Sequence, residues 1–105
     1  MSNIGKWESA EPGVKRKIFQ PGEGLMMMEV QFEKGAEGYE HSHIHEQMSY
    51  CIKGKIAFRI DGEETMLNQG ETIYIPSHAK HSVTALEESI LLDTFTPVRE
   101  DLLKR

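Results

Sequence analysis

The chain has 105 residues and a formal net charge of -5, with 28% charged and 38% hydrophobic residues. This length allows one compact domain, residues 1–105, and is too short for two cores of ordinary size. The acidic balance argues against a nucleic-acid partner, which needs a clustered basic surface. The short basic run at residues 15–17 is expected to be solvated.

Three further features bear on localisation. No stretch approaches the roughly 18 consecutive apolar residues of a membrane span. The first residues lack the apolar centre of a signal peptide, and the single cysteine, Cys51, cannot close an intramolecular disulfide. We therefore expect a cytoplasmic protein with no membrane partner.

Short apolar alternations separated by turn residues run from Ile18 almost to the end of the chain. In residues 26–32, alternate positions form one apolar face: Met26, Met28, Val30 and Phe32. A period of two predicts a half-buried strand. The adjacent methionines lie on alternating faces, so we expect core packing rather than a soft-metal site. Further strands are predicted at residues 47–53, 55–60, 64–67, 72–75, 81–85 and 89–95.

Turn residues separate these strands. Asp61-Gly62 predicts a tight hairpin with positive φ. Gly54 and Gly70 mark the neighbouring joins, and Pro76 ends the strand before it. Only residues 98–104 are compatible with a short helix. Many short, evenly spaced strands predict an all-β sandwich or barrel without linker or repeat.

Histidines concentrate in residues 41–47. In a strand, His41 and His43 would project from one face about 6.8 Å apart, so that both imidazoles could reach one ion at about 2.0–2.1 Å. Gln47 has the same parity and adds an oxygen, and His81 opens a later strand that barrel closure could bring alongside. The alternative is a polar strand face without a metal.

The other two histidines, His45 and His78, are interpreted as surface residues. His45 shares the parity of His41 and His43, so a bulge could exchange their roles.

Two spaced motifs make the histidine pattern specific. Residues 35–54 read Gly35-x5-His41-x-His43-x3-Gln47-x6-Gly54, and residues 70–81 read Gly70-x5-Pro76-x-His78-x2-His81. They resemble the two cupin motifs, with Gln47 where that family usually has Glu, His78 where it has Gly, and Ala85 where it has Asn. The resemblance implies a cupin-type double-stranded β-helix, a jelly-roll barrel, holding one divalent metal ion. It says little about the reaction, because cupins host many chemistries.

The segment from Leu92 to Asp101, residues 41–47 and the run Ile75-Pro76-Ser77 are similar to the KdgF-type cupins of pectin and alginate breakdown. That resemblance implies conversion of 4,5-unsaturated monouronates to linear 5-keto-4-deoxyuronate. The metal ligands that it implies are His41, His43, Gln47 and His81. The catalytic residues that it implies beside the metal are Asp93, Phe95 and Arg99.

The chemistry is consistent with these assignments. Three imidazoles and an amide leave a +2 charge uncompensated, which favours an anionic sugar acid as ligand. Arg99 could bind its carboxylate, and Asp93 could transfer one of the protons that ring opening requires. Imidazole ligands do not choose among Zn, Ni, Fe and Mn.

Alternatives remain open for each of these residues. Asp93 is also compatible with a turn cap, Phe95 with the core and Arg99 with a surface ion pair. The same ligands would serve a cupin dioxygenase, another sugar isomerase or a non-catalytic sugar-acid-binding protein.

Strand parity makes one more prediction. If Gln47 faces the metal, Ser49 and Cys51 also face inward, and an apolar row faces outward: Met48, Tyr50 and Ile52. A contiguous apolar row calls for a cover. We expect a homodimer with a contribution from the partner's N-terminal residues, the alternative being that the chain's own first strands cover the row.

Overall fold

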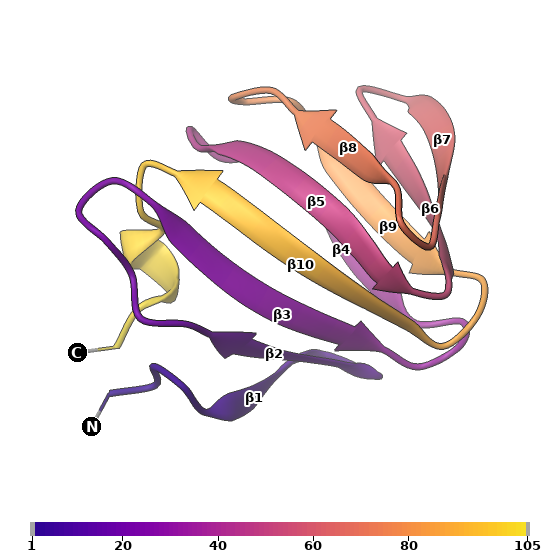
Figure 1. Cartoon of the computed structure of the whole chain (residues 1–105). Helices are drawn as coiled ribbons and strands as arrows, with labels where there is room; N and C mark the ends of the chain where they lie inside the picture. Colours follow the sequence, from indigo (N-terminus) through magenta and orange to yellow (C-terminus); the bar gives the residue numbers. More distant parts are fainter. Residues whose placement is uncertain (1, 105) are drawn as a thin grey trace.

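The computed structural model describes residues 2–104, which form ten strands and one short 3-10 helix (Figure 1). The elements in chain order are β1 Trp7–Glu11, β2 Val14–Ile18, β3 Met26–Phe32, β4 Glu37–His41, β5 Glu46–Lys53, β6 Lys55–Ile60, β7 Glu63–Asn68, β8 Thr72–Ile75, β9 His81–Ala85, β10 Ser89–Thr96 and η1 Glu100–Leu102.

The strands form two antiparallel sheets that face each other. The larger sheet has the order β1-β2-β3-β10-β5-β8, and the smaller has the order β4-β9-β6-β7. In the view of Figure 1 the larger sheet lies in front of β4 and β9. The core fills the space between the two sheets. This architecture confirms the prediction of a small all-β domain. No helix within residues 2–104 is long and apolar enough to cross a membrane.

The predicted alternation is realised where one strand face is buried. On β3, Met26 is 1% exposed and Met27 is 39% exposed, and the inward residues of the strand continue the buried face. All six further predicted strands are present, three with the predicted bounds and three extended by one residue at one or both ends.

Three strands escaped prediction. β1 and β4 are sheet edges made mostly of polar residues, and β2 has charged residues between its apolar ends. An edge strand that is partly solvated does not show the apolar period on which prediction depends. The predicted tail helix is reduced to the single turn η1, because so few residues cannot sustain an isolated helix.

The turns take the predicted backbone geometry. Asp61 and Gly62 have φ of 49° and 83°, and Ile60 pairs with Glu63 across them, which makes the predicted two-residue hairpin. Gly54 has φ of 92° and lies against the start of β10, so closely that a Cβ there would overlap Ser89. This close approach ties the β5–β6 turn to β10.

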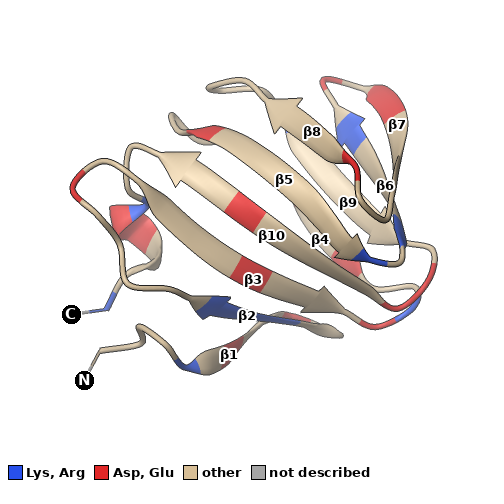
Figure 2. Ribbon diagram, viewed as in Figure 1, with Lys and Arg blue, Asp and Glu red and all other residues tan. Residues whose placement is uncertain are grey.

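The two faces of β5 separate as predicted. Gln47, Ser49 and Cys51 are buried, whereas the outward row is 45%, 42% and 40% exposed at Met48, Tyr50 and Ile52. The first strands do not cover this row, because β1 and β2 extend the same sheet beyond β3. Figure 2 shows that β8 and the middle of β5 carry no charged residue. The described chain therefore leaves an apolar outer face exposed.

The ends of the described chain are joined by hydrogen bonds. The backbone N–H of Asn3 donates to the Lys104 carbonyl oxygen at 3.1 Å, and the Lys104 N–H donates to Asn3 Oδ1 at 2.9 Å. The Asn3 amide also donates to the Leu102 carbonyl oxygen at 2.9 Å. These bonds hold the segment after β10, which contains Arg99, against the N-terminal strands.

Candidate metal centre

Three histidines converge at one end of the barrel. His41, the last residue of β4, pairs in register with His81, the first residue of β9. His43 follows in the loop, and the nitrogens that these three residues offer lie within 4.8 Å of one another. This three-histidine cluster (His41, His43 and His81) is positioned to bind one metal ion.

The route to this convergence differs from the predicted one. Because β4 ends at His41, His43 does not share a strand face with it. The loop is instead fixed by a hydrogen bond from the His78 N–H to the His43 carbonyl oxygen, at 2.8 Å. Strand parity thus predicted that His41 and His43 come together, but the loop after β4 brings them together and not a shared strand face.

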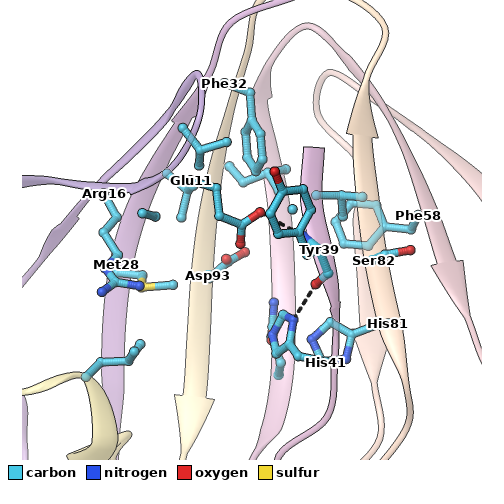
Figure 3. A pocket seen from close by; sticks show the side chains of 18 of the residues that line it. Glu11, Arg16, Met28, Phe32, Tyr39, His41, Phe58, His81, Ser82 and Asp93 are labelled. Carbon is cyan, nitrogen blue, oxygen red and sulfur yellow. Dashed lines mark hydrogen bonds between the residues drawn. The ribbon is translucent and has the colours of Figure 1, made fainter. Parts of the chain in front are cut away.

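Backbone carbonyls orient all three rings. The Nδ1 atoms of the cluster, in chain order, lie 2.8, 3.0 and 2.9 Å from the carbonyl oxygens of Tyr39, His45 and Ala79. Figure 3 shows the first of these bonds. A carbonyl accepts only, so each Nδ1 carries the hydrogen and each Nε2 keeps its lone pair. Such a contact on the other nitrogen is the usual support of a metal-bound histidine.

The electrostatics favour neutral rings. Burial lowers the pKa of His81 to about 4. Burial, followed by the nearby Arg99 charge, also lowers the pKa of His43. Neutral imidazole is the form that binds metal. His81 Nε2 is buried without a hydrogen-bond partner among the described residues, which a metal ion would relieve.

Gln47 stands beside the cluster on β5. Its Oε1 lies 3.2 Å from His43 Nε2, and its Nε2 donates to Ser49 Oγ at 3.0 Å. In neutral His43, two electron-pair donors therefore face each other across 3.2 Å. A cation between them would satisfy both, so these residues fit a divalent ion bound by imidazole and amide oxygen.

Asp93 lies in the middle of β10 and faces the barrel interior, which excludes the turn-cap alternative. Ser49 Oγ donates a hydrogen bond of 2.6 Å to Asp93 Oδ1. Burial raises the pKa of Asp93 to about 6, against the opposing effect of the Ser49 hydrogen bond.

Phe95 and Arg99 pack together next to the cluster. The Phe95 ring meets the His43 ring edge to face, with centroids 5.8 Å apart, and the Arg99 guanidinium carbon lies 5.1 Å from the Phe95 centroid. Arg99 is buried and donates from Nε and Nη2 to both Asp101 carboxylate oxygens, at 3.1 and 2.8 Å. It is an ion-paired residue, but a buried one that lines the pocket.

A pocket of about 290 Å³ opens at this end of the barrel (Figure 3). This size fits a small ligand. Most of its lining is apolar, with Met28, Val30 and Leu91 among the contributors, and its polar lining includes His41, Gln47, His81, Asp93 and Arg99. The pocket therefore brings three of the four predicted metal ligands together with the predicted catalytic residues, and His43 stands behind Phe95 in contact with its ring.

Arg16 lines the same pocket, which the sequence interpretation missed. It was expected in a solvated run, yet it shares the inward face of β2 with Val14 and Ile18, and its Nε donates to Glu8 Oε1 at 3.0 Å. The sequence signal that could have placed Arg16 on the inward face is its strand parity with the apolar residues Val14 and Ile18. Arg16 thus adds a second arginine to the lining of the pocket.

The two remaining histidines have different outcomes. His78 is exposed, as predicted, with φ of 67°. This left-handed conformation accounts for the glycine that the cupin motif usually places there. The surface prediction for His45 is wrong: its side chain is buried, its Nδ1 lacks a partner among the described residues, and its ring lies 5.3 Å from that of His43.

Comparisons with known proteins agree with this geometry. A family model described as the cupin domain matches residues 28–95. The pectin degradation protein KdgF of Dickeya dadantii (strain 3937) is 42% identical over 99 residues, which cover 92% of this chain and 90% of that protein. The structure of KdgF from Halomonas sp. aligns with a TM-score of 0.87 at 36% identity, over 92% of this chain and 90% of the other. An RmlC-like cupin from Shewanella frigidimarina aligns with a TM-score of 0.86 at 38% identity, over 91% and 86%.

Proposed function

The chain belongs to the cupin family, in the group that contains the pectin degradation protein KdgF, and from this premise we propose that it is a metal-dependent enzyme acting on sugar acids. The proposed reaction converts 4,5-unsaturated monouronates, released by pectin or alginate lyases, to linear 5-keto-4-deoxyuronate. The observation that supports the proposal is the pocket, which His41 and His81 of the three-histidine cluster line together with Asp93, Phe95 and Arg99.

The proposed ligands are His41, His43, Gln47 and His81. All four side chains are neutral donors, so a divalent ion bound there would keep its full charge and act as a Lewis acid on substrate oxygens. An anionic substrate is the complement of such a centre. The donor set does not distinguish Zn, Ni, Fe and Mn.

The proposed reaction is an isomerisation. The anomeric hydroxyl loses its proton, the bond between C1 and the ring oxygen breaks, and C4 takes up a proton as the C5 carbonyl forms. Asp93 is proposed to carry one of these protons, which is supported by its place in the pocket and by its raised pKa, near 6. A carboxyl group with such a pKa exchanges protons readily near neutral pH.

The other two residues are proposed to hold the substrate. Arg99 keeps donors on Nη1 after its two bonds to Asp101, and these can bind a uronate carboxylate. The Phe95 ring contacts both the Arg99 guanidinium and the His43 ring, so it is proposed to hold these two groups in place.

The test is the ultraviolet band of the substrate's enol-ether double bond, followed as protein is mixed with lyase-generated monouronate. We expect loss of this band well above the buffer rate, and a fall towards the buffer rate after chelation or in His81→Ala. A wild-type rate equal to buffer would refute the enzyme. Saturable monouronate binding without turnover would then identify a sugar-acid-binding protein.

We also propose that the protein is a homodimer through the outer face of β5. The exposed row of Met48, Tyr50 and Ile52 supports this proposal, and Met27 and Tyr74 extend it at 39% and 47% exposure. Residue pairing aligns Met27, Thr94, Met48 and Tyr74 across four strands. Light scattering on dilute protein is expected to give twice the 12.0 kDa chain mass, and Tyr50→Lys should give monomers. A wild-type monomer would refute the proposal.

A further inference from the structure

A buried serine links two functional side chains. Ser49 is fully buried on β5 and pairs in register with Asp93 on β10. Its hydroxyl donates to Asp93 Oδ1 at 2.6 Å and accepts from Gln47 Nε2 at 3.0 Å. The far end of the same amide, Oε1, lies 3.2 Å from His43 Nε2. An unbroken row of hydrogen-bonding groups therefore runs from Asp93 to the metal centre.

The hydrogen bonds in this row have a fixed direction. A serine hydroxyl has one hydrogen, and a carboxylate accepts only. Once Ser49 donates to Asp93, its oxygen can only accept, so the group that Gln47 turns towards it must be the NH₂. The amide oxygen then points to the three-histidine cluster.

This direction matters because an amide binds a metal through its oxygen and not through its NH₂. If Gln47 turned over, its NH₂ would donate to the lone pair of His43 Nε2 and compete with a metal ion for that nitrogen. Both orientations fill the same space, so packing does not choose between them. The choice depends on what the other end of the amide meets.

We infer that Ser49 is a positioning residue that fixes the Gln47 amide with its oxygen towards the metal. The inference rests on the proposed metal centre. Loss of a group that orients a ligand typically lowers metal affinity 10- to 100-fold. In Ser49→Ala the Asp93 carboxylate remains nearby and still favours an NH₂ group on that side of the amide. We therefore expect metal affinity to fall about tenfold.

The experiment measures Co²⁺ affinity of metal-free protein by chelator competition, together with the visible absorption of bound Co²⁺, which reports ligand number and geometry. Ser49→Ala is expected to bind Co²⁺ about tenfold more weakly with an altered spectrum. Ser49→Thr keeps the hydroxyl and should stay within about threefold of wild type. Ser89→Ala is the matched control, since Ser89 is equally buried and its hydroxyl is bonded to the backbone of Glu87 and Lys55, away from the metal centre.

A second comparison, made in the Gln47→Glu protein, distinguishes the loss of amide orientation from a general loss of packing around Ser49. In Gln47→Glu, the two carboxylate oxygens are equivalent, so no orientation has to be chosen and adding Ser49→Ala should cost less than about twofold. Three results would overturn the inference: Ser49→Ala within twofold of wild type, equal losses in both backgrounds, or a loss in Ser49→Thr as large as in Ser49→Ala. Failure of wild type to bind Co²⁺ would refute the metal centre and this inference together. Binding that is insensitive to Ser49 would refute this inference alone.

Discussion

Gly54 offers a quantitative test of how the barrel is held together. In Gly54→Ala, the new Cβ would lie 2.9 Å from Ser89 Cα and closer still to the Ser89 hydroxyl and the Glu88 carbonyl oxygen. Two of these three atoms belong to the backbone, so a rotamer change cannot remove the overlap. The β5–β6 turn and the start of β10 must move apart.

The expected loss of stability has two parts. A left-handed backbone costs a residue with a Cβ about 1–2 kcal/mol, and Gly54 has φ of 92°. Separation of the two segments also stretches the hydrogen bonds from the Lys55 N–H to Ser89 Oγ, at 3.1 Å, and from the Leu86 N–H to the Lys55 carbonyl oxygen, at 2.9 Å. At about 1 kcal/mol each, these bring the expected loss to about 3–4 kcal/mol.

Gly70→Ala is the matched control. Gly70 has a similar φ of 87°, but an added Cβ would meet nothing within 4 Å. It should lose only the backbone part, about 1–2 kcal/mol. Thermal unfolding followed by circular dichroism should therefore show a drop of about 12–20 °C for Gly54→Ala and about 4–10 °C for Gly70→Ala. Equal drops would refute the role assigned to the contact with β10.

Three further predictions concern the candidate site. His81→Ala should lose most of the metal that the purified wild type carries, by elemental analysis; retention of full occupancy would contradict the four-ligand assignment. Removing the metal from wild type with a chelator should lower the thermal midpoint by several degrees, because binding stabilises only the folded state; an unchanged midpoint would contradict a metal bound to the folded protein. Asp93→Ala should reduce turnover of unsaturated monouronate at least 100-fold, because it removes the proposed proton carrier. The substitution should not lower the thermal midpoint, because burial disfavours the ionised form of this carboxyl group. A wild-type rate would exclude proton transfer by Asp93.

Prediction from sequence succeeded for strands in which burial of one face requires apolar residues at alternate positions. The strands that contain Met26 and Gln47 each bury one face, and their alternation predicted their inward residues and, to within one residue, their bounds. The edge strand that ends at His41 has no such face, so it escaped prediction. His41 and His81 lie side by side because their strands pair. The pairing of strands that are distant in the sequence cannot be predicted from the local alternation of residues. The joint role of the two histidines came from the motif resemblance.

The site's supporting contacts were beyond sequence reasoning. Burial of His45 depends on how the loop after β4 folds back, and the loop has no apolar period to report it. The sequence left open an ion pair of Arg99, but it could not identify Asp101 as the partner, because two residues in an irregular tail have no fixed relative direction. Arg16 was the avoidable error, since its parity with Val14 and Ile18 placed it on the inner face.

The hydrogen bonds that join Asn3 to Lys104 and Leu102 make the described chain almost a closed loop. Where such a loop is cut matters little to strand pairing. A short linker across this junction would allow new ends at the Asp61-Gly62 turn, whose two residues lie outside both flanking strands. A circular permutant of this kind would carry the His41–Gln47 stretch and the His81 strand in reversed chain order while preserving their contacts. The metal centre depends on the closure of the barrel, and the order in which its ligands are synthesised is free to change.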